Sequence, residues 1–211
     1  MGSDRGGFGL FGKYPQKPDF VAHGLSAPIR APLESWIVAG YHQSRTALGD
    51  DWKDRFLSAP ILRFWIGARV MGAGCIGAMM PSVDQVGRYF PLILYYGWSD
   101  GAEIAPPVDD GHERWFADLE AALLATLRGD APDEPAEITQ ALGPPAAIDA
   151  DDWRSREIIR LTGDQSYWWI GNTAPQAANG LPDAGQMFLA LLQDPAAAPE
   201  GERHDRATLH D

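Results

Sequence analysis

Two glycine patterns are the first candidates for chemistry, because glycine-rich loops bind phosphate through backbone amides. Residues Gly7 to Lys13 have the spacing G-x-x-x-x-G-K with which a P-loop begins. The next residue is Tyr14, where a P-loop carries a Ser or Thr hydroxyl for magnesium. Pro15 follows and prevents the helix whose N-terminal amides would face the phosphate. This segment is therefore predicted to be a strand and a turn.

The second pattern is G-x-G-x-x-G at Gly72, Gly74 and Gly77. A dinucleotide site needs a strand before this pattern, a helix after it and an acid about 20 residues further on. Pro81 ends any helix that could follow, and no acid lies near position 92. The pattern instead predicts a glycine turn between two antiparallel strands.

Metal and nucleophile chemistry have little support. The single cysteine is Cys75, so neither a disulfide within the chain nor a cluster of thiolate ligands can form. The sequence has no G-x-S-x-G motif, and Ser82 has no base close to it in sequence, although a base distant in sequence stays open. No cofactor is expected. The histidines are scattered and show no metal-ligand spacing; they are His23, His42, His112, His204 and His210.

Ser82, Asp84 and Arg88 remain, in a polar segment between two apolar stretches. Asp84 and Arg88 could pair across a turn as a structural salt bridge, or they could present a charged loop to a partner. A third possibility is a small hydrolase or another ligand-binding enzyme with a pocket around these three residues.

The net charge of the chain disfavours some classes of binding partner. Seventeen basic and twenty-nine acidic residues give a formal net charge of -12, which disfavours nucleic acid and anionic membrane surfaces. We expect neither a signal peptide nor a transmembrane segment, because the apolar runs of this sequence are too short for either. With one cysteine, a cytoplasmic location is expected.

Hydrophobic periodicity predicts the elements that must position these residues. Helices are expected over about 32–48, 52–59, 111–128 and 182–192. Asp50 or Asp51 is expected to cap the second helix, and a capping box of Asp110 and Glu113 to open the third. Residues 130–152 are expected to be mostly loop, with a short helix possible around Ile138. Five strands are expected, over 6–13, 61–68, 75–80, 88–96 and 165–171, the middle three as an antiparallel meander.

Adjacent aromatic residues in these strands indicate the architecture. Neighbouring side chains in a strand point to opposite faces, so each doublet places rings on both faces of the sheet. We therefore expect an α/β fold, a three-layer αβα sandwich around a mainly antiparallel sheet of about five strands. Residues 1–193 are expected to form one domain, and 194–211 a disordered tail. The doublets are Phe64-Trp65, Tyr89-Phe90, Tyr95-Tyr96 and Trp168-Trp169.

Several separated motifs, in a fixed order, resemble the TagF family, also called ImpM, of type VI secretion proteins. The motifs are GKYPQKPDF at 12–20, SAPILRF at 58–64, PSVDQVGRYFPL at 81–92, SYWW at 166–169 and GLP at 180–182. The resemblance spans about residues 8 to 193.

This resemblance implies a function in protein binding. TagF proteins are known as cytoplasmic, post-translational repressors of type VI secretion that act through a scaffold protein with a forkhead-associated domain, and no catalytic residues are established for them. The chain is therefore expected to be a regulator and not an enzyme. The motif positions that become candidates for partner binding are Asp19, Ser82, Asp84, Arg88, Trp168 and Trp169. For the two tryptophans, packing in the core is the other possibility.

Overall fold

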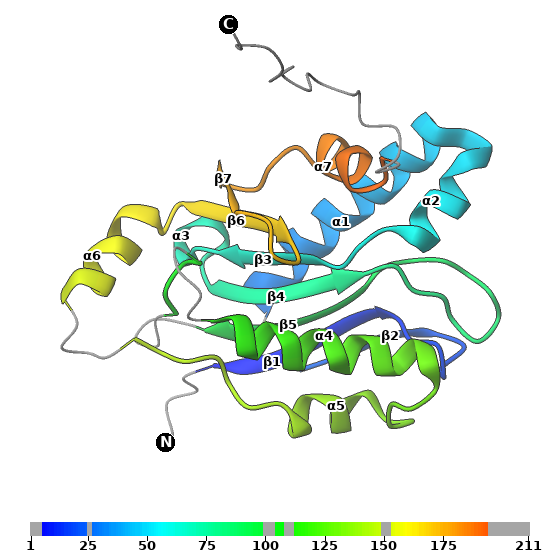
Figure 1. The fold of residues 1–211 in the computed structure, drawn as a ribbon, viewed down its shortest axis with the longest axis horizontal. Helices are drawn as coiled ribbons and strands as arrows, with labels where there is room; N and C mark the ends of the chain where they lie inside the picture. The colour runs from blue at the N-terminus through cyan, green and yellow to red at the C-terminus, as the bar shows by residue number, and fades with distance from the viewer. Residues whose placement is uncertain (1–5, 25–26, 99–103, 108–111, 149–152, 194–211) are drawn as a thin grey trace, which may run out of the picture.

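The computed structural model describes residues 6–24, 27–98, 104–107, 112–148 and 153–193. Within them, one seven-stranded sheet has the order β2-β1-β5-β4-β3-β6-β7, and every neighbouring pair is antiparallel (Figure 1). The strands are β1 (Gly7–Lys13), β2 (Phe20–His23), β3 (Leu62–Ile66), β4 (Gly74–Met80), β5 (Leu92–Trp98), β6 (Gln165–Ile170) and β7 (Gln176–Asn179). The helices are α1 (Ala27–Leu48), the short 3-10 helix η1 (Gly49–Asp51), α2 (Trp52–Ser58), α3 (Ala68–Met71), α4 (Glu113–Arg128), α5 (Pro135–Ala141), α6 (Trp153–Thr162) and α7 (Ala184–Leu191).

The α/β class and the meander of β3, β4 and β5 are confirmed, but the count of about five strands is wrong. The two additional strands, β2 and β7, form the edges of the sheet, have four residues each and are mostly exposed. Their sequences, FVAH and QAAN, do not alternate apolar and polar residues. These segments are extended because β1 and β6 offer them backbone partners, and that information is not local in the sequence.

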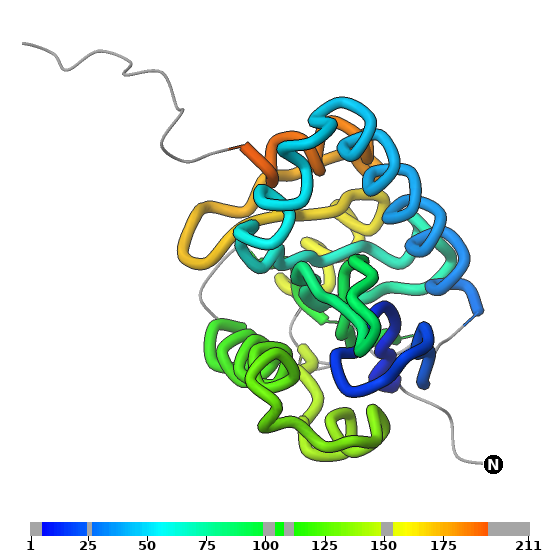
Figure 2. Tube along the Cα trace, turned by 90° about the vertical axis from the view of Figure 1, so that its right-hand side faces the viewer, coloured from blue at the N-terminus to red at the C-terminus, as the bar shows by residue number. Residues whose placement is uncertain are grey.

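Helices cover both faces of the sheet (Figure 2). One apolar cluster joins α1, α2 and α7 to the first face, and a second joins α4 and α5 to the other. Three of the aromatic doublets divide as predicted: Phe64, Tyr95 and Trp168 pack in the first cluster, while Trp65, Tyr96 and Trp169 pack in the second. The sheet therefore lies between two helical layers.

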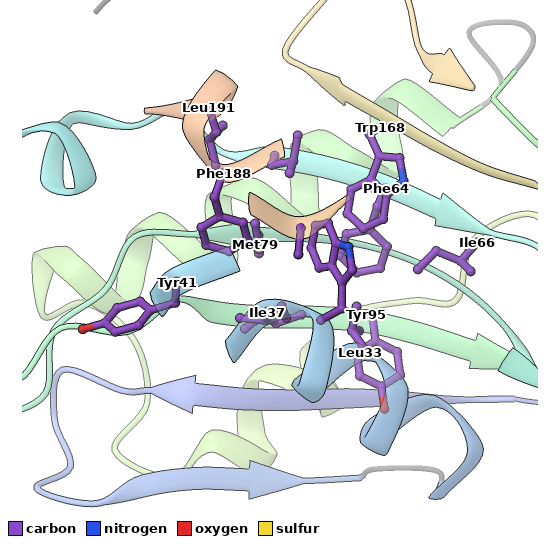
Figure 3. Close-up of a cluster of buried hydrophobic side chains, with 14 of the residues drawn as sticks. Leu33, Ile37, Tyr41, Phe64, Ile66, Met79, Tyr95, Trp168, Phe188 and Leu191 are labelled. Atoms are coloured by element: carbon purple, nitrogen blue, oxygen red, sulfur yellow. The ribbon is translucent and has the colours of Figure 1, made fainter. Parts of the chain in front are cut away.

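Figure 3 shows the first cluster, where α1 and α7 meet over the sheet. Leu33 and Ile37 of α1 and Phe64 and Trp168 of the strands belong to this cluster, and all four side chains are almost fully buried. Phe188 of α7 packs so closely on α1 that a side chain at Gly40 would overlap its ring. This glycine lets the two helices approach each other.

Several helix boundaries follow local signals, and others do not. Gly129 ends α4 in the left-handed conformation, at φ 77°. Asp51 occupies the position before α2, but its side chain makes no capping hydrogen bond. Asp110 lies outside the described residues. α5 confirms the possible short helix in 130–152, whereas α6 was not predicted. None of the helices in the described ranges combines the length and apolarity needed to cross a membrane.

Both glycine patterns belong to strands and turns. Gly7–Lys13 is strand β1, and Gly72, in the left-handed conformation, precedes β4. Gly12 has a further role, because its φ is +126° and a Cβ there would overlap the carbonyl oxygen of Pro91. The end of β1 therefore lies directly against the chain that enters β5.

Candidate functional site

The segment between β4 and β5, residues 81–91, is called the signature loop below. It folds back on itself: Val83 and Tyr89 form an isolated β-bridge, and the Phe90 amide donates to the carbonyl of Ser82 at 3.1 Å. Gly87 turns the chain at φ 86°. The tip, residues 85–88, is exposed to solvent.

This closed loop corrects one prediction. The strand expected from residue 88 begins only at Leu92, after Pro91, which lacks the N–H that a strand would need. Tyr89 and Phe90 consequently do not face opposite layers, since both pack against the first cluster.

Asp84 is the centre of the signature loop. Its carboxylate is fully buried, and Oδ2 accepts from Lys13 Nζ and from Arg88 Nε, both at 2.7 Å. Oδ1 accepts from the backbone amides of Arg88 at 2.8 Å and Val86 at 3.1 Å. Four donors therefore satisfy one carboxylate, and they fix the loop to β1 and to its own tip.

These donors set the ionisation of Asp84. Burial raises the pKa of the carboxyl, but the hydrogen bonds from Lys13 and from the backbone and side chain of Arg88 outweigh it and hold the pKa well below the usual range. Perturbed carboxyl pKa values often mark catalytic sites, yet structural ion pairs perturb them too. A carboxylate held ionised by four donors is a weak proton acceptor, which favours the structural salt bridge.

Arg88 joins the signature loop to the turn between β1 and β2. Its guanidinium donates to the carbonyl of Pro18 and lies 3.9 Å from the carboxylate of Asp19. The amide of Gln85 donates to the carbonyl of Lys17 at 3.1 Å. Asp19 is almost fully exposed and Arg88 is half-exposed, so these two motif residues do lie together on the surface.

Ser82 does not form a nucleophile site with these residues. Its side chain is buried, and its hydroxyl oxygen has no hydrogen-bond partner among the described residues. A small apolar pocket behind the loop is lined by Pro81, Pro91, Met80 and Phe188, among others. Its volume of about 10 Å³ leaves room for no more than about one water molecule. Within the described part of the chain, no cluster of three or more His, Cys, Asp or Glu is placed to hold a metal.

A larger open cleft lies between α2 and the end of α7. It is lined by residues including Asp54, Arg55, Pro60 and Leu191, and its lining does not include Ser82, Asp84 or Arg88.

Trp168 and Trp169 lie apart from the signature loop, on opposite faces of β6. Trp168 stacks on Trp36 at 4.6 Å between ring centroids, and its indole N–H donates to Ser166 Oγ at 2.8 Å. Trp169 packs edge to face on Phe116 at 5.0 Å. Both tryptophans are buried, so neither is an exposed interface anchor. Ser82 and Asp84 are buried too, and direct contact with a partner does not fit them either.

Sequence reasoning missed the role of Arg63, although it belongs to the SAPILRF motif. Arg63 is buried in β3, donates to Glu113 at 2.9 Å and Glu120 at 2.6 Å, and lies 4.9 Å from the ring centroid of Phe116. Burial opposes its charge, but hydrogen bonds to Glu120 and Glu113 raise its pKa. A charged residue inside an apolar strand was the available signal, because such a residue needs a partner.

Comparison with known proteins identifies the class of protein to which this chain belongs. The family model described as "TagF N-terminal domain, Type VI secretion system-associated" matches residues 9–142. The chain is therefore a type VI secretion-associated protein. It belongs to the TagF family.

A solved structure is similar over most of the fold. The crystal structure of PA0076 from Pseudomonas aeruginosa PAO1 shares 29% sequence identity and superposes with a TM-score of 0.73. The match covers 88% of this chain and 93% of that chain. A search of curated proteins gave no match.

Proposed function

We propose that this protein is a post-translational repressor of bacterial type VI secretion that acts in the cytoplasm by binding, without catalysis. Its partner would be a scaffold of the secretion system, such as the component with a forkhead-associated domain. Membership of the TagF family supports the connection with type VI secretion.

The observation that carries the binding role is the division of the signature loop into a buried base and an exposed tip. Asp84 and Ser82 are buried, while Val86 is 63% exposed and Arg88 extends over the surface. A tip whose base is fixed by hydrogen bonds loses little conformational freedom when a partner binds. The loop can therefore present a defined surface at a low entropic cost.

Chemistry at the same residues is less well supported. No described residue accepts a hydrogen bond from the Ser82 hydroxyl, Asp84 is held ionised, and the pocket behind the loop has no room for a substrate. The small hydrolase therefore has no specific observation in its favour.

The experiment is to delete the gene in its host and measure secretion of the tube protein of the system. Repression predicts increased secretion, which the intact gene restores. Purified protein should also capture the scaffold protein. Unchanged secretion together with no capture would refute the proposal.

A matched pair of variants tests the loop itself. Val86→Asp places a charge on the exposed tip and should reduce capture of the scaffold protein. The control, Leu161→Asp, places the same charge on an apolar residue of similar exposure, 58%, on α6 (Figure 1) and should leave capture unchanged. α6 lies at the opposite end of the molecule from the loop. Equal capture by both variants would place the binding surface elsewhere.

A further inference from the structure

The chain contains only three lysines, and all three contact the signature loop or its base. Lys13 pairs with Asp84, and the carbonyl of Lys17 accepts from the amide of Gln85. Lys53 of α2 places its ammonium 5.5 Å from the ring centroid of Tyr89. Segments far apart in the sequence therefore bring every lysine to one place.

With Arg88, these residues form what we call the cationic surface: Lys13, Lys17, Lys53 and Arg88. Its charge differs from that of the chain as a whole, which is -12. Lys13 is largely neutralised by the buried Asp84. Arg88 also pairs with Asp84, and two exposed carboxylates contact this surface: Asp19 lies beside Arg88, and Glu134 pairs with Lys17. The four cations and these three carboxylates leave a net charge of +1.

Exposed apolar side chains lie within this surface. Val86 at the tip is 63% exposed, and Phe20 of β2 is 39% exposed. Phe20 contacts Phe90 of the signature loop edge to face, with 5.5 Å between ring centroids. An apolar centre bordered by charged groups is the usual anatomy of a protein interface.

We propose that the cationic surface binds an acidic segment of the partner protein, whose carboxylates meet Lys17, Lys53 and Arg88 while an apolar side chain covers Val86. Charge complementarity favours this occupant, because the surface has a net charge of +1 within a chain whose net charge is -12. The inference rests on the proposed function, since it names the chemistry of the segment that the repressor would bind.

The test uses the full chain and a labelled synthetic peptide of alternating glutamate and leucine, with binding followed by fluorescence anisotropy. A peptide with lysine in place of glutamate is the charge control. The acidic peptide should bind more tightly than the basic one, and its affinity should fall between about 50 mM and about 500 mM NaCl, as screening predicts. Preference for the basic peptide would overturn the inference, as would equally tight binding of a short DNA duplex.

Two variants locate the site. Lys17→Gln with Lys53→Gln should weaken binding of the acidic peptide about fivefold at low salt. The matched control, Arg30→Gln with Arg156→Gln, removes the same charge from exposed positions outside the cationic surface and should leave binding within about twofold of the unmodified chain. Equal weakening by both pairs would overturn the inference. Thermal melting of each variant shows that the fold is retained.

Capture of the scaffold separates this inference from the proposed function. If the scaffold is captured equally well by the lysine variant and the unmodified chain, the inference fails and the proposed function stands. If the scaffold is not captured at all but the acidic peptide binds and the lysine variant loses it, the proposed function fails and the inference stands.

Discussion

Trp168 and Trp169 provide a sharp test of how β6 is stabilised, because they are neighbours with different surroundings. Trp168 donates a hydrogen bond to Ser166 and stacks on Trp36, whereas the indole of Trp169 makes an edge contact with Phe116 and no hydrogen bond to a described residue. Changing each to phenylalanine removes the indole N–H and part of the ring. Only at Trp168 does the change also remove a buried hydrogen bond.

The expected magnitudes follow from these contacts. Loss of buried ring atoms destabilises either variant by about 1 to 2 kcal/mol. At Trp168 the lost hydrogen bond adds about 1 kcal/mol and reduced stacking about 0.5 kcal/mol. Trp168→Phe should therefore cost about 2.5 to 3.5 kcal/mol, against about 1 to 2 kcal/mol for Trp169→Phe. The larger value is a substantial part of a typical stability of about 5 to 15 kcal/mol.

Urea unfolding followed by far-ultraviolet circular dichroism measures both variants without relying on tryptophan fluorescence. A double-mutant cycle that adds Ser166→Ala should give a coupling of about 1 kcal/mol with Trp168→Phe. Below their unfolding transitions, both tryptophan variants should still capture the scaffold, because neither ring is exposed. Equal destabilisation of the two variants with no coupling to Ser166 would refute the reasoning, and selective loss of capture by folded Trp168→Phe would return that residue to the interface.

Three further predictions concern the residues that hold the sheet and the signature loop together. Asp84→Asn should lower the free energy of unfolding at neutral pH and make it depend less on pH, because the pKa of Asp84 in the folded state lies below its unfolded value of about 3.9. The contribution of Asp84 is complete above about pH 5 and is lost on acidification. Urea unfolding between about pH 2 and pH 7 that shows the same pH dependence for the variant and the unmodified chain would contradict this. Arg63→Met should lower stability by only about 1 kcal/mol, because methionine fills the space and water can hydrate Glu113 and Glu120. Arg63→Ala leaves a cavity and should lower stability by about 2 to 4 kcal/mol. A lower melting temperature for Arg63→Met than for Arg63→Ala would contradict this. Gly12→Ala should greatly reduce soluble yield because its Cβ overlaps the backbone at Pro91, and normal yield with an unchanged melting temperature would contradict the geometry.

The major elements were predictable where the pattern is local and strong. The stripe of α1, the apolar runs of β3 and β4, and Gly129 at the end of α4 each have a signal within a few residues. α6 escaped prediction because its sequence, WRSREIIRLT, is largely polar, so the segment did not stand out from the polar sequence before it. The edge strands escaped because pairing, and not composition, makes them extended.

The candidate site was predictable only in part. The motif positions identified the correct segment, and the possible pairing of Asp84 with Arg88 is present. The sequence did not indicate which motif residues are exposed. Lys53 carried no local signal, and the motif that contains Lys13 did not indicate its contact with Asp84. These relations come from the pairing of β1 with β5 and from the packing of α2.

The order of the motifs was enough to predict the family, and strand alternation was enough to predict the α/β class and the division of most aromatic doublets between two faces, because both are properties of the chain. Folding had to be seen to learn that Ser82, Asp84, Trp168 and Trp169 are buried while Asp19 and Arg88 are exposed. Burial depends on which distant segments come to lie against each residue. The same long-range packing gathers the three lysines around one loop, which no local pattern encodes.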